Sequence, residues 1–312
     1  MSTMSRRRFV EAGALVAGAA ATGAARAQPP NGRLRLGFIG VGNRGSQLLA
    51  ATLPNADVEV IALCDVYEPY LKQQAAKVGG TVATYSDFRE VLKRDDIHGV
   101  VIATPDHWHA IQTIMACDAG KDVYVEKPLC ITIREGRRMV EAARRNQRIV
   151  QVGTHRRSST LLPQLRELIR GGAIGKVTVA RCYRISNMFP DGIGRAEDSD
   201  PPEGLNWDMW LGPRAERPFN PTIAPYKFRW HGAYSSQVAN WGIHYLDAIR
   251  WMLDEEAPRS VVALGGRFAV NDRRDIPDTM EAVFELPSGC LLVFGQYEAS
   301  NNPALRSGEM EL

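Results

Sequence analysis

From Leu34 onward, short apolar runs rich in β-branched residues alternate with longer stretches in which apolar positions recur at helical spacing. Such alternation, with short connections, is typical of a parallel sheet that helices cover on both faces. The runs are LRLGFI (34–39), VEVIAL (58–63), VVIA (100–103), DVYVE (122–126) and RIVQVG (148–153), and the helical stretches cover 44–53, 68–77, 107–119 and 132–146. The pattern predicts an α/β domain over residues 31–155.

The pattern changes after residue 155. Helices are predicted over 159–170, where two glycines follow, and over 242–253. Between them, residues 188–235 are rich in proline, glycine and tryptophan, and their aromatic content favours an ordered excursion. The remaining apolar runs predict strands over 176–186, 260–270, 279–289 and 290–300. We therefore expect a second α/β domain over 156–312, with a large, mostly antiparallel open sheet; its final strand-like run indicates a truncated C-terminus.

The first 27 residues have the three parts of an export signal. Arg6–Arg8 form a positive start, Ala12–Ala25 form a short apolar stretch, and Ala25–Ala27 (Ala-Arg-Ala) offer a cleavage site. The residues around the arginines resemble the S-R-R-x-F-L pattern of twin-arginine signals, and the apolar stretch is too short for a stable membrane span. We expect cleavage after Ala27 and a periplasmic protein exported by the twin-arginine machinery.

The positive charge of the chain belongs to this leader. Residues 1–27 carry four arginines against Glu11, which accounts for the whole formal net charge of +3. The rest of the chain is about neutral, which argues against a nucleic-acid partner. The five cysteines are odd in number and lack C-x-x-C spacing, so we interpret them as core residues, with one disulfide left open for an exported protein.

Residues 40–45 read G-x-G-x-x-G, directly between the first predicted strand and the first predicted helix. In this context the glycines allow a tight turn, and the start of the helix faces the phosphates of a dinucleotide. Asp65 ends the second strand, 20 residues after Gly45, where a carboxylate accepts ribose hydroxyls and repels a 2′-phosphate. The motif predicts bound NAD in preference to NADP. The cofactor-binding candidates of the loop are Gly40, Gly42, Asn43, Arg44 and Gly45.

Three further stretches extend this pattern: ATPDHWHA (103–110), YVEKPL (124–129) and ANWGIHYLDAIRWML (239–253). In this order behind GFIGVGNRG, they resemble the Gfo/Idh/MocA oxidoreductase family, and the resemblance covers nearly all of the chain after the leader. It implies an N-terminal Rossmann domain that binds NAD, and a C-terminal α/β domain whose sheet forms the substrate floor and a homo-oligomer interface.

The resemblance also implies roles for single residues. Lys127 of the E-K-P motif would contact the substrate hydroxyl and the nicotinamide ribose, and His244 follows the C-terminal acid motif by four residues. The chemistry agrees: removing a hydride from an alcohol carbon requires a base for the hydroxyl proton, and a lysine near a cationic ring has a lowered pKa. A neutral histidine suits a proton relay. We predict Lys127 and His244 as catalytic residues. The cofactor-lining candidates here are Thr104, Pro105, His109, Glu126 and Lys127.

Asn240 departs from the family pattern, which commonly has Asp there. An amide cannot act as a base, although it can orient a hydroxyl group. Either proton transfer rests on Lys127 and His244, or the reaction differs from the usual dehydrogenation.

The remaining candidates have structural alternatives. We predict that Asn240, Arg157, Arg229 and His231 contact substrate; alternatively, Arg157 caps the domain junction and the FRWH run (228–231) packs in the core. His107 and His109 alternate as metal ligands can, but no third ligand stands at a suitable spacing, so no metal is predicted.

Three functions remain open. The favoured one is an NAD-dependent dehydrogenase that acts on a sugar, polyol or sugar derivative and holds NAD tightly, because an exported enzyme meets no ready pool of free dinucleotide. The alternative is a redox-neutral glycosidase or lyase that oxidises a sugar carbon transiently, as some exported members of the family do. The third is a non-catalytic sugar- or NAD-binding protein, against which the presence of both Lys127 and His244 counts.

Overall fold

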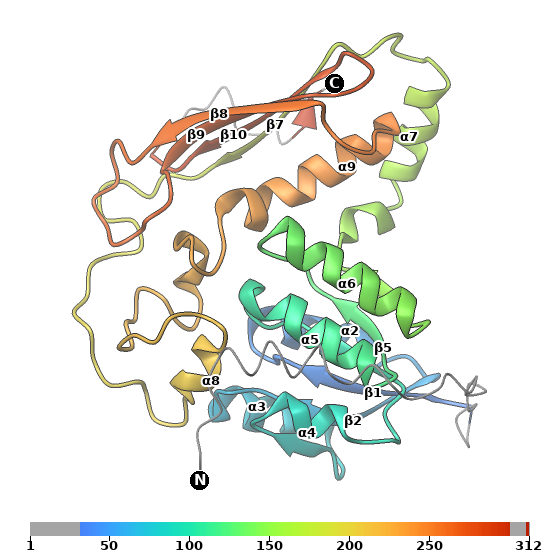
Figure 1. Ribbon diagram of the computed structural model, residues 1–312, viewed down its shortest axis with the longest axis vertical. Helices are drawn as coiled ribbons and strands as arrows, with labels where there is room; N and C mark the ends of the chain where they lie inside the picture. Colours follow the sequence, from blue (N-terminus) through green and yellow to red (C-terminus); the bar gives the residue numbers. More distant parts are fainter. Residues whose placement is uncertain (1–31, 300–309, 312) are drawn as a thin grey trace.

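The computed structural model describes residues 32–299 and 310–311, and these form two sheets with helices between and around them (Figure 1). The export signal expected over residues 1–27 lies outside the described residues. In Figure 1 the N-terminal sheet lies at the bottom and the C-terminal sheet at the top, and α6 (Ile133–Arg145) and α9 (Ile243–Leu253) lie between them.

The N-terminal sheet has six strands, all parallel, in the order β3-β2-β1-β4-β5-β6. This is the strand order of a Rossmann domain, and the predicted fold class is confirmed. Ligands of such sheets bind beyond the carboxyl ends of the strands, at the switch point between β1 and β4. The strands are β1 (Leu34–Ile39), β2 (Val58–Cys64), β3 (Ala83–Tyr85), β4 (Gly99–Ile102), β5 (Asp122–Val125) and β6 (Val150–Val152), and the other helices are α2 (Asn43–Thr52), α3 (Glu68–Val78), α4 (Phe88–Leu92) and α5 (Asp106–Asp118).

The central strands of this sheet are apolar because helices cover both faces. All four residues of β4 are buried, as are Phe38 of β1 and Leu63 of β2. Burial of a large apolar side chain stabilises the folded state by about 1.5–3 kcal/mol. The helix α6 begins with a capping box, in which the Thr132 hydroxyl accepts from the Glu135 N–H and the Glu135 carboxylate accepts from the Thr132 N–H. This cap fixes the chain five residues after Lys127.

The C-terminal sheet has the order β11-β7-β10-β9-β8. Three of its neighbouring pairs are antiparallel, and β7 and β10 are parallel. The sheet is mostly antiparallel, as predicted. The parallel pair arises because the chain leaves β7, runs through a long excursion and α9, enters the sheet again at the edge strand β8, and reaches β10 beside β7 through two antiparallel pairs. The strands are β7 (Val179–Ile185), β8 (Ser260–Gly266), β9 (Thr279–Glu285), β10 (Leu291–Tyr297) and β11 (Met310–Glu311).

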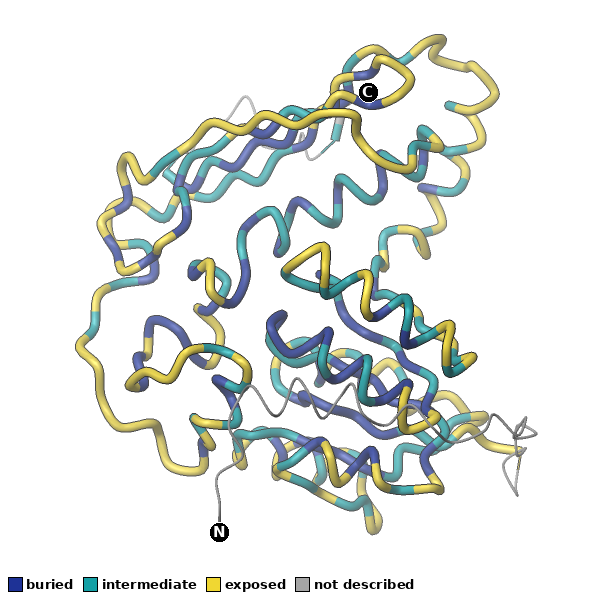
Figure 2. Tube along the Cα trace, in the orientation of Figure 1, coloured by how far each residue is buried: buried dark blue, intermediate teal, exposed yellow. Residues whose placement is uncertain are grey.

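One face of this sheet packs on helices and the other does not. Helices α7 (Leu162–Arg170) and α9 bury Leu292 and Phe294 of β10 on the inner face. On the opposite face, Val262 and Leu264 of β8 are 60% and 78% exposed. Figure 2 shows β8 as an exposed edge of the molecule.

The excursion between β7 and α9 is ordered around an aromatic cluster that contains Trp210, Phe219, Phe228 and Tyr234. It contains α8 (Trp207–Leu211) and a short 3-10 helix, η2 (Lys227–Trp230), and a π-helical turn, η3 (Val238–Gly242), then leads into α9. In Figure 1, α8 lies beside α3 of the Rossmann domain. All five cysteines belong to the described residues and none pairs with another. Within the described ranges, no helix combines the length and apolar character needed to cross a bilayer.

Candidate functional site

The glycine motif forms the turn from β1 into α2. Gly40 has φ +82°, and a Cβ there would lie 2.8 Å from the backbone of Ala103 and Thr104. A Cβ on Gly45 would lie 1.9 Å from the Gly40 carbonyl oxygen. Only glycine satisfies both positions. No side chain caps the start of α2, so its first N–H groups are available to a phosphate.

Asp65 lies at the carboxyl end of β2 and closes the same turn. Its Oδ2 accepts from the Val41 N–H at 2.8 Å and its Oδ1 from the Tyr67 N–H at 2.9 Å. Burial raises the pKa of Asp65, while the backbone N–H groups of Tyr67 and Val41 oppose that rise. A carboxylate has about four lone-pair positions, so Asp65 can still accept ribose hydroxyls.

A cavity of about 320 Å³ lies over this turn. Both domains line it: the Rossmann side supplies the glycine loop and Asp65, and the excursion supplies aromatic side chains and Arg229. The predicted site residues that line it are Gly40, Gly42, Asn43, Arg44, Asp65, Thr104, Pro105 and Arg229. Its position at the switch point and its glycine-dependent floor fit a dinucleotide.

Residues 204–212, here called the cover segment, close one side of this cavity. The Glu68 N–H donates to the Gly204 carbonyl at 2.9 Å, and the Asn206 N–H donates to the Val66 carbonyl at 2.9 Å. At its other end, the Trp210 carbonyl accepts from His107 Nε2 at 2.9 Å and from Trp108 Nε1 at 3.1 Å. The substrate domain is thereby joined to the Rossmann domain beside the cofactor cavity.

Lys127 lies where the two domains meet. Its Nζ donates to the Asn240 carbonyl at 2.8 Å and to the Asn240 side-chain oxygen at 3.2 Å. Burial lowers the pKa of Lys127 to about 8, with Asp106 opposing and Arg229 adding to the fall. A substantial fraction of Lys127 is therefore neutral near physiological pH, as a general base requires.

His244, one turn after Asn240, stands beside this lysine. Burial, and next the Lys127 charge, lower the pKa of His244 to about 3, so its ring is neutral. Its Nδ1 is buried and has no hydrogen-bond partner among the described residues. The His155 ring packs edge-on against the His244 ring, with 4.7 Å between the two ring centroids. A neutral ring with an unsatisfied nitrogen can hydrogen-bond a substrate hydroxyl.

His109 and Glu126 hold the two loops around Lys127. The ring nitrogens of His109 face the Pro128 carbonyl at 2.6 Å and the Thr104 carbonyl at 2.8 Å. Glu126 is 3% exposed and accepts from Arg44 Nε at 2.9 Å, which ties the E-K-P loop to the glycine loop. These two predicted cofactor residues therefore fix the shape of the site.

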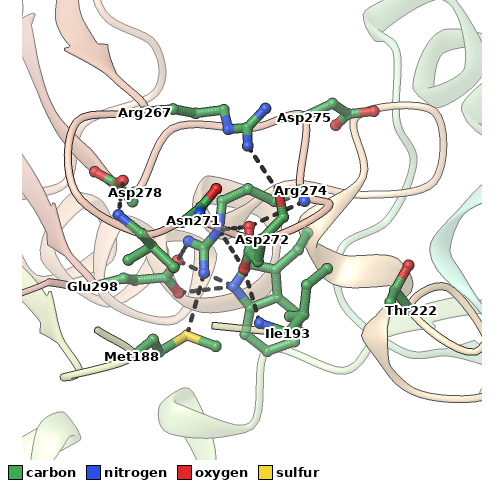
Figure 3. Close-up of polar contacts among 12 residues, drawn as sticks. Met188, Ile193, Thr222, Arg267, Asn271, Asp272, Arg274, Asp275, Asp278 and Glu298 are labelled. Carbon is green, nitrogen blue, oxygen red and sulfur yellow. Dashed lines mark hydrogen bonds and ion pairs between the residues drawn. The ribbon is translucent and has the colours of Figure 1, made fainter. Parts of the chain in front are cut away.

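A buried ion cluster beneath η2 supports Arg229. Figure 3 shows the guanidinium of Arg274 between Asp272 and Glu298. Glu298 also accepts from the Trp230 indole N–H at 3.0 Å, so the cluster anchors the residue next to Arg229. The Arg229 guanidinium lies 4.2 Å from the ring centroid of Tyr226, on the cavity wall.

Two predicted substrate residues are placed elsewhere. Arg157 forms a two-pronged ion pair with Asp247 of α9, at 2.6 and 2.8 Å. His231 is 5% exposed and its Nε2 faces the Thr222 carbonyl at 2.8 Å. Neither is among the described residues that line the cavity, and the same is true of Lys127, Asn240 and His244, which lie at the domain junction. Their assignment to substrate stays a prediction, and the geometry agrees with the structural alternatives.

The structure also adds residues that sequence reasoning did not single out. Tyr67, Tyr70 and Trp108 line the cavity, and Asp106 is buried beside it. Their signal in the sequence is only an aromatic or acidic residue near a motif. The described part of the chain holds no group of three or more potential metal ligands.

The comparisons with known proteins agree with this geometry. Residues 34–154 match a family described as "Oxidoreductase family, NAD-binding Rossmann fold", and residues 160–301 match the C-terminal alpha/beta domain of the same oxidoreductase family. The chain belongs to the Gfo/Idh/MocA family. It is therefore an oxidoreductase with an NAD-binding Rossmann domain, and the predicted resemblance is confirmed.

Individual relatives differ in their described activities. The chain is 27% identical to the rhizopine catabolism protein MocA of Rhizobium meliloti, over 77% of this chain and 74% of that protein. It is 34% identical to a glycosyl hydrolase family 109 protein of Shewanella putrefaciens, over 47% of this chain and 39% of that one. The solved WlbA dehydrogenase of Bordetella pertussis, in complex with NADH and UDP-GlcNAcA, has a similar fold: TM-score 0.68 at 20% identity, over 87% and 74% of the two chains.

Proposed function

We propose that this Gfo/Idh/MocA protein is an NAD-dependent dehydrogenase of a sugar, polyol or sugar derivative. The observation that carries this is the arrangement of Lys127: a half-buried lysine, with its pKa lowered to about 8, held on Asn240 where the two domains meet, near the neutral His244. Similar proteins include an inositol 2-dehydrogenase of Salmonella typhimurium and a dehydrogenase solved with UDP-GlcNAcA, which supports the substrate class.

The residues of the chain divide the work of the reaction. Bound NAD would supply the hydride acceptor, held by the glycine loop, Arg44 and Asp65. Lys127 Nζ, when neutral, accepts the proton of the substrate hydroxyl. Asn240 orients Nζ through two oxygens, and His244 Nδ1 is available to the same hydroxyl. The cover segment and Arg229 form part of the cavity wall.

The alternative is a redox-neutral glycosidase or lyase, in which the hydride taken from a sugar carbon is returned in the same turnover. The match to a glycosyl hydrolase family 109 protein favours it, as does the amide at Asn240 in place of a carboxylate.

Both functions need a cofactor that stays in its site. We propose that the protein is exported through the twin-arginine pathway to the periplasm with NAD already bound, and that it forms a homo-oligomer through the C-terminal sheet.

The test starts with the cofactor. Full-length protein is purified natively and denatured, and the released dinucleotide is identified by mass spectrometry. We expect NAD(H) close to one per chain. Sugars, polyols and aryl glycosides are then offered, with absorbance at 340 nm and glycoside cleavage as readouts. Reduction without bond cleavage supports the dehydrogenase; cleavage without net reduction supports the alternative. If no dinucleotide is released on denaturation or bound on titration, both proposals fail.

Asp65 decides between NAD and NADP in this proposal. The Asp65→Ala variant should bind NAD about tenfold or more weakly and lose its discrimination against NADP, because the carboxylate that accepts ribose hydroxyls and repels a 2′-phosphate is gone. Fluorescence titration with both dinucleotides measures the change. Asp57→Ala, in the loop before the same strand, is the control. Unchanged affinities in Asp65→Ala would contradict the assignment.

A further inference from the structure

Asp106 is a buried carboxylate close to Lys127 that has no role in the mechanism above. It begins α5 directly after Pro105 and is 6% exposed. Its Oδ2 accepts a hydrogen bond from the Ser235 hydroxyl, which belongs to the substrate domain. A buried carboxylate needs hydrogen-bond donors or positive charges around it. The groups that surround Asp106 therefore indicate its role.

Those surroundings are positively charged. His109, Lys127 and Arg229 all face Asp106, from its own helix, the E-K-P loop and the substrate domain. The two ring nitrogens of His109 lie next to the Pro128 and Thr104 carbonyl oxygens, which holds this ring beside Asp106. Burial raises the pKa of Asp106, while His109, the Ser235 hydroxyl, Arg229 and Lys127 oppose that rise. The N-terminus of α5 also favours a negative charge.

Lys127, in turn, has two carboxylates near it, Asp106 and Glu126, and only Glu126 forms an ion pair with another residue among those described. The titratable and charged groups that face it or interact with it are Asp106, Glu126, Arg44, Arg229, His155 and His244. The Glu126 carboxylate forms an ion pair with Arg44, with 2.9 Å between Glu126 Oε1 and Arg44 Nε. The hydrogen bonds of Lys127 Nζ go to the neutral oxygens of Asn240. Asp106 is therefore the carboxylate left to balance the lysine.

A chain of contacts also joins Asp106 to the residue that holds Lys127. Asp106 accepts from Ser235, and the carbonyl of the next residue, Ser236, accepts from the Asn240 N–H at 2.8 Å. Asn240 then receives both hydrogen bonds of Lys127. The contact between Asp106 and Ser235 thus fixes the turn that presents Asn240.

We propose that Asp106 is a positioning residue of this active site: its ionised carboxylate is the counter-charge of Lys127, and its bond to Ser235 sets the turn that carries Asn240. The proposal rests on the proposed function, in which Lys127 is the base. By its charge, Asp106 holds back the loss of the Lys127 proton, and so sets the pH at which the base becomes available.

The test reads the lysine directly and needs no substrate. Full-length protein is acetylated with trace acetic anhydride between pH 6 and 10.5, and the Lys127 peptide is quantified by mass spectrometry. In the wild type we expect a midpoint near pH 8. In Asp106→Asn the midpoint should fall by about one pH unit, because a nearby negative charge stabilises the ammonium. Asp106→Glu should keep the wild-type midpoint.

Asp118→Asn is the matched control, because it makes the same change at the other end of α5 at an exposed ion pair with Arg145; its midpoint should not move. A wild-type midpoint retained in Asp106→Asn would overturn the proposal. If Asp106→Asn does not fold by circular dichroism, Asp106→Ser replaces it, since serine suits the start of a helix and removes the same charge; the same fall is required. Absence of bound NAD would defeat the proposed function, while the labelling would still decide the role of Asp106.

Discussion

At the scale of single residues, substitution of Lys127 should reduce turnover without weakening NAD binding. Lys127→Met deletes the proposed base and leaves the glycine loop and Asp65 intact. We expect turnover to fall by about 10²–10⁴-fold, the usual contribution of a general base, with NAD affinity retained. Lys121→Met is the control, because Lys121 is also a buried lysine of the Rossmann domain but donates to the Arg94 carbonyl, away from the site. Normal turnover in Lys127→Met would contradict the mechanism.

The same residue links pH to stability. Burial lowers the pKa of Lys127 from 10.5 to about 8 in the folded protein. Between pH 8 and 10.5 the unfolded chain binds more protons at this residue than the folded one does, so its contribution to the free energy of unfolding rises with pH. At saturation this amounts to at most about 3 kcal/mol.

Urea unfolding of wild type and Lys127→Met, at pH 7, 8, 9 and 10, measures this linkage. The wild type should gain stability relative to the variant as the pH rises through this window. A difference between the two proteins that does not change with pH would show that Lys127 is not held in a low-pKa environment.

At the scale of elements, the cover segment is held closely enough for one methyl group to disturb it. Gly212 follows α8 with φ +51°, and a Cβ there would lie 2.0 Å from the Trp108 ring. In Gly212→Ala either the segment or the Trp108 ring must shift, and both line the cavity, so we expect NAD to dissociate about tenfold or more faster. Dilution of holoprotein into a NAD-scavenging enzyme measures the rate.

Gly175→Ala separates this effect from backbone strain. Gly175 has φ +71° and no atom within 4 Å of its Cβ position, so the substitution introduces comparable strain without a collision. Its NAD dissociation rate should match the wild type. Equal rates in both variants would show that the cover segment does not retain the cofactor.

The cover segment is a part of the site that could not be predicted from the sequence. The glycine loop and the E-K-P motif were predictable because a strand, a turn and a helix adjoin in the chain and the demands on each residue are local. The bond between Asp106 and Ser235 joins residues 129 positions apart, and no periodicity reports such a contact. The same holds for α8, whose five residues are too few for a helical pattern to stand out.

At the scale of the whole molecule, the face of the C-terminal sheet that no described helix covers is a surface suited to an interface with another subunit. On β8, Val262 and Leu264 lie on the face opposite α9, and an exposed apolar edge strand tends to associate. We therefore expect a homo-oligomer that buries this face, and Leu264→Lys should dissociate it into monomers of unchanged circular dichroism. Light scattering coupled to size exclusion measures the mass. Ile133→Lys is the control, because Ile133 is 94% exposed at the start of α6, a helix of the Rossmann domain. An oligomer that persists in Leu264→Lys, or that is lost equally in Ile133→Lys, would place the interface elsewhere.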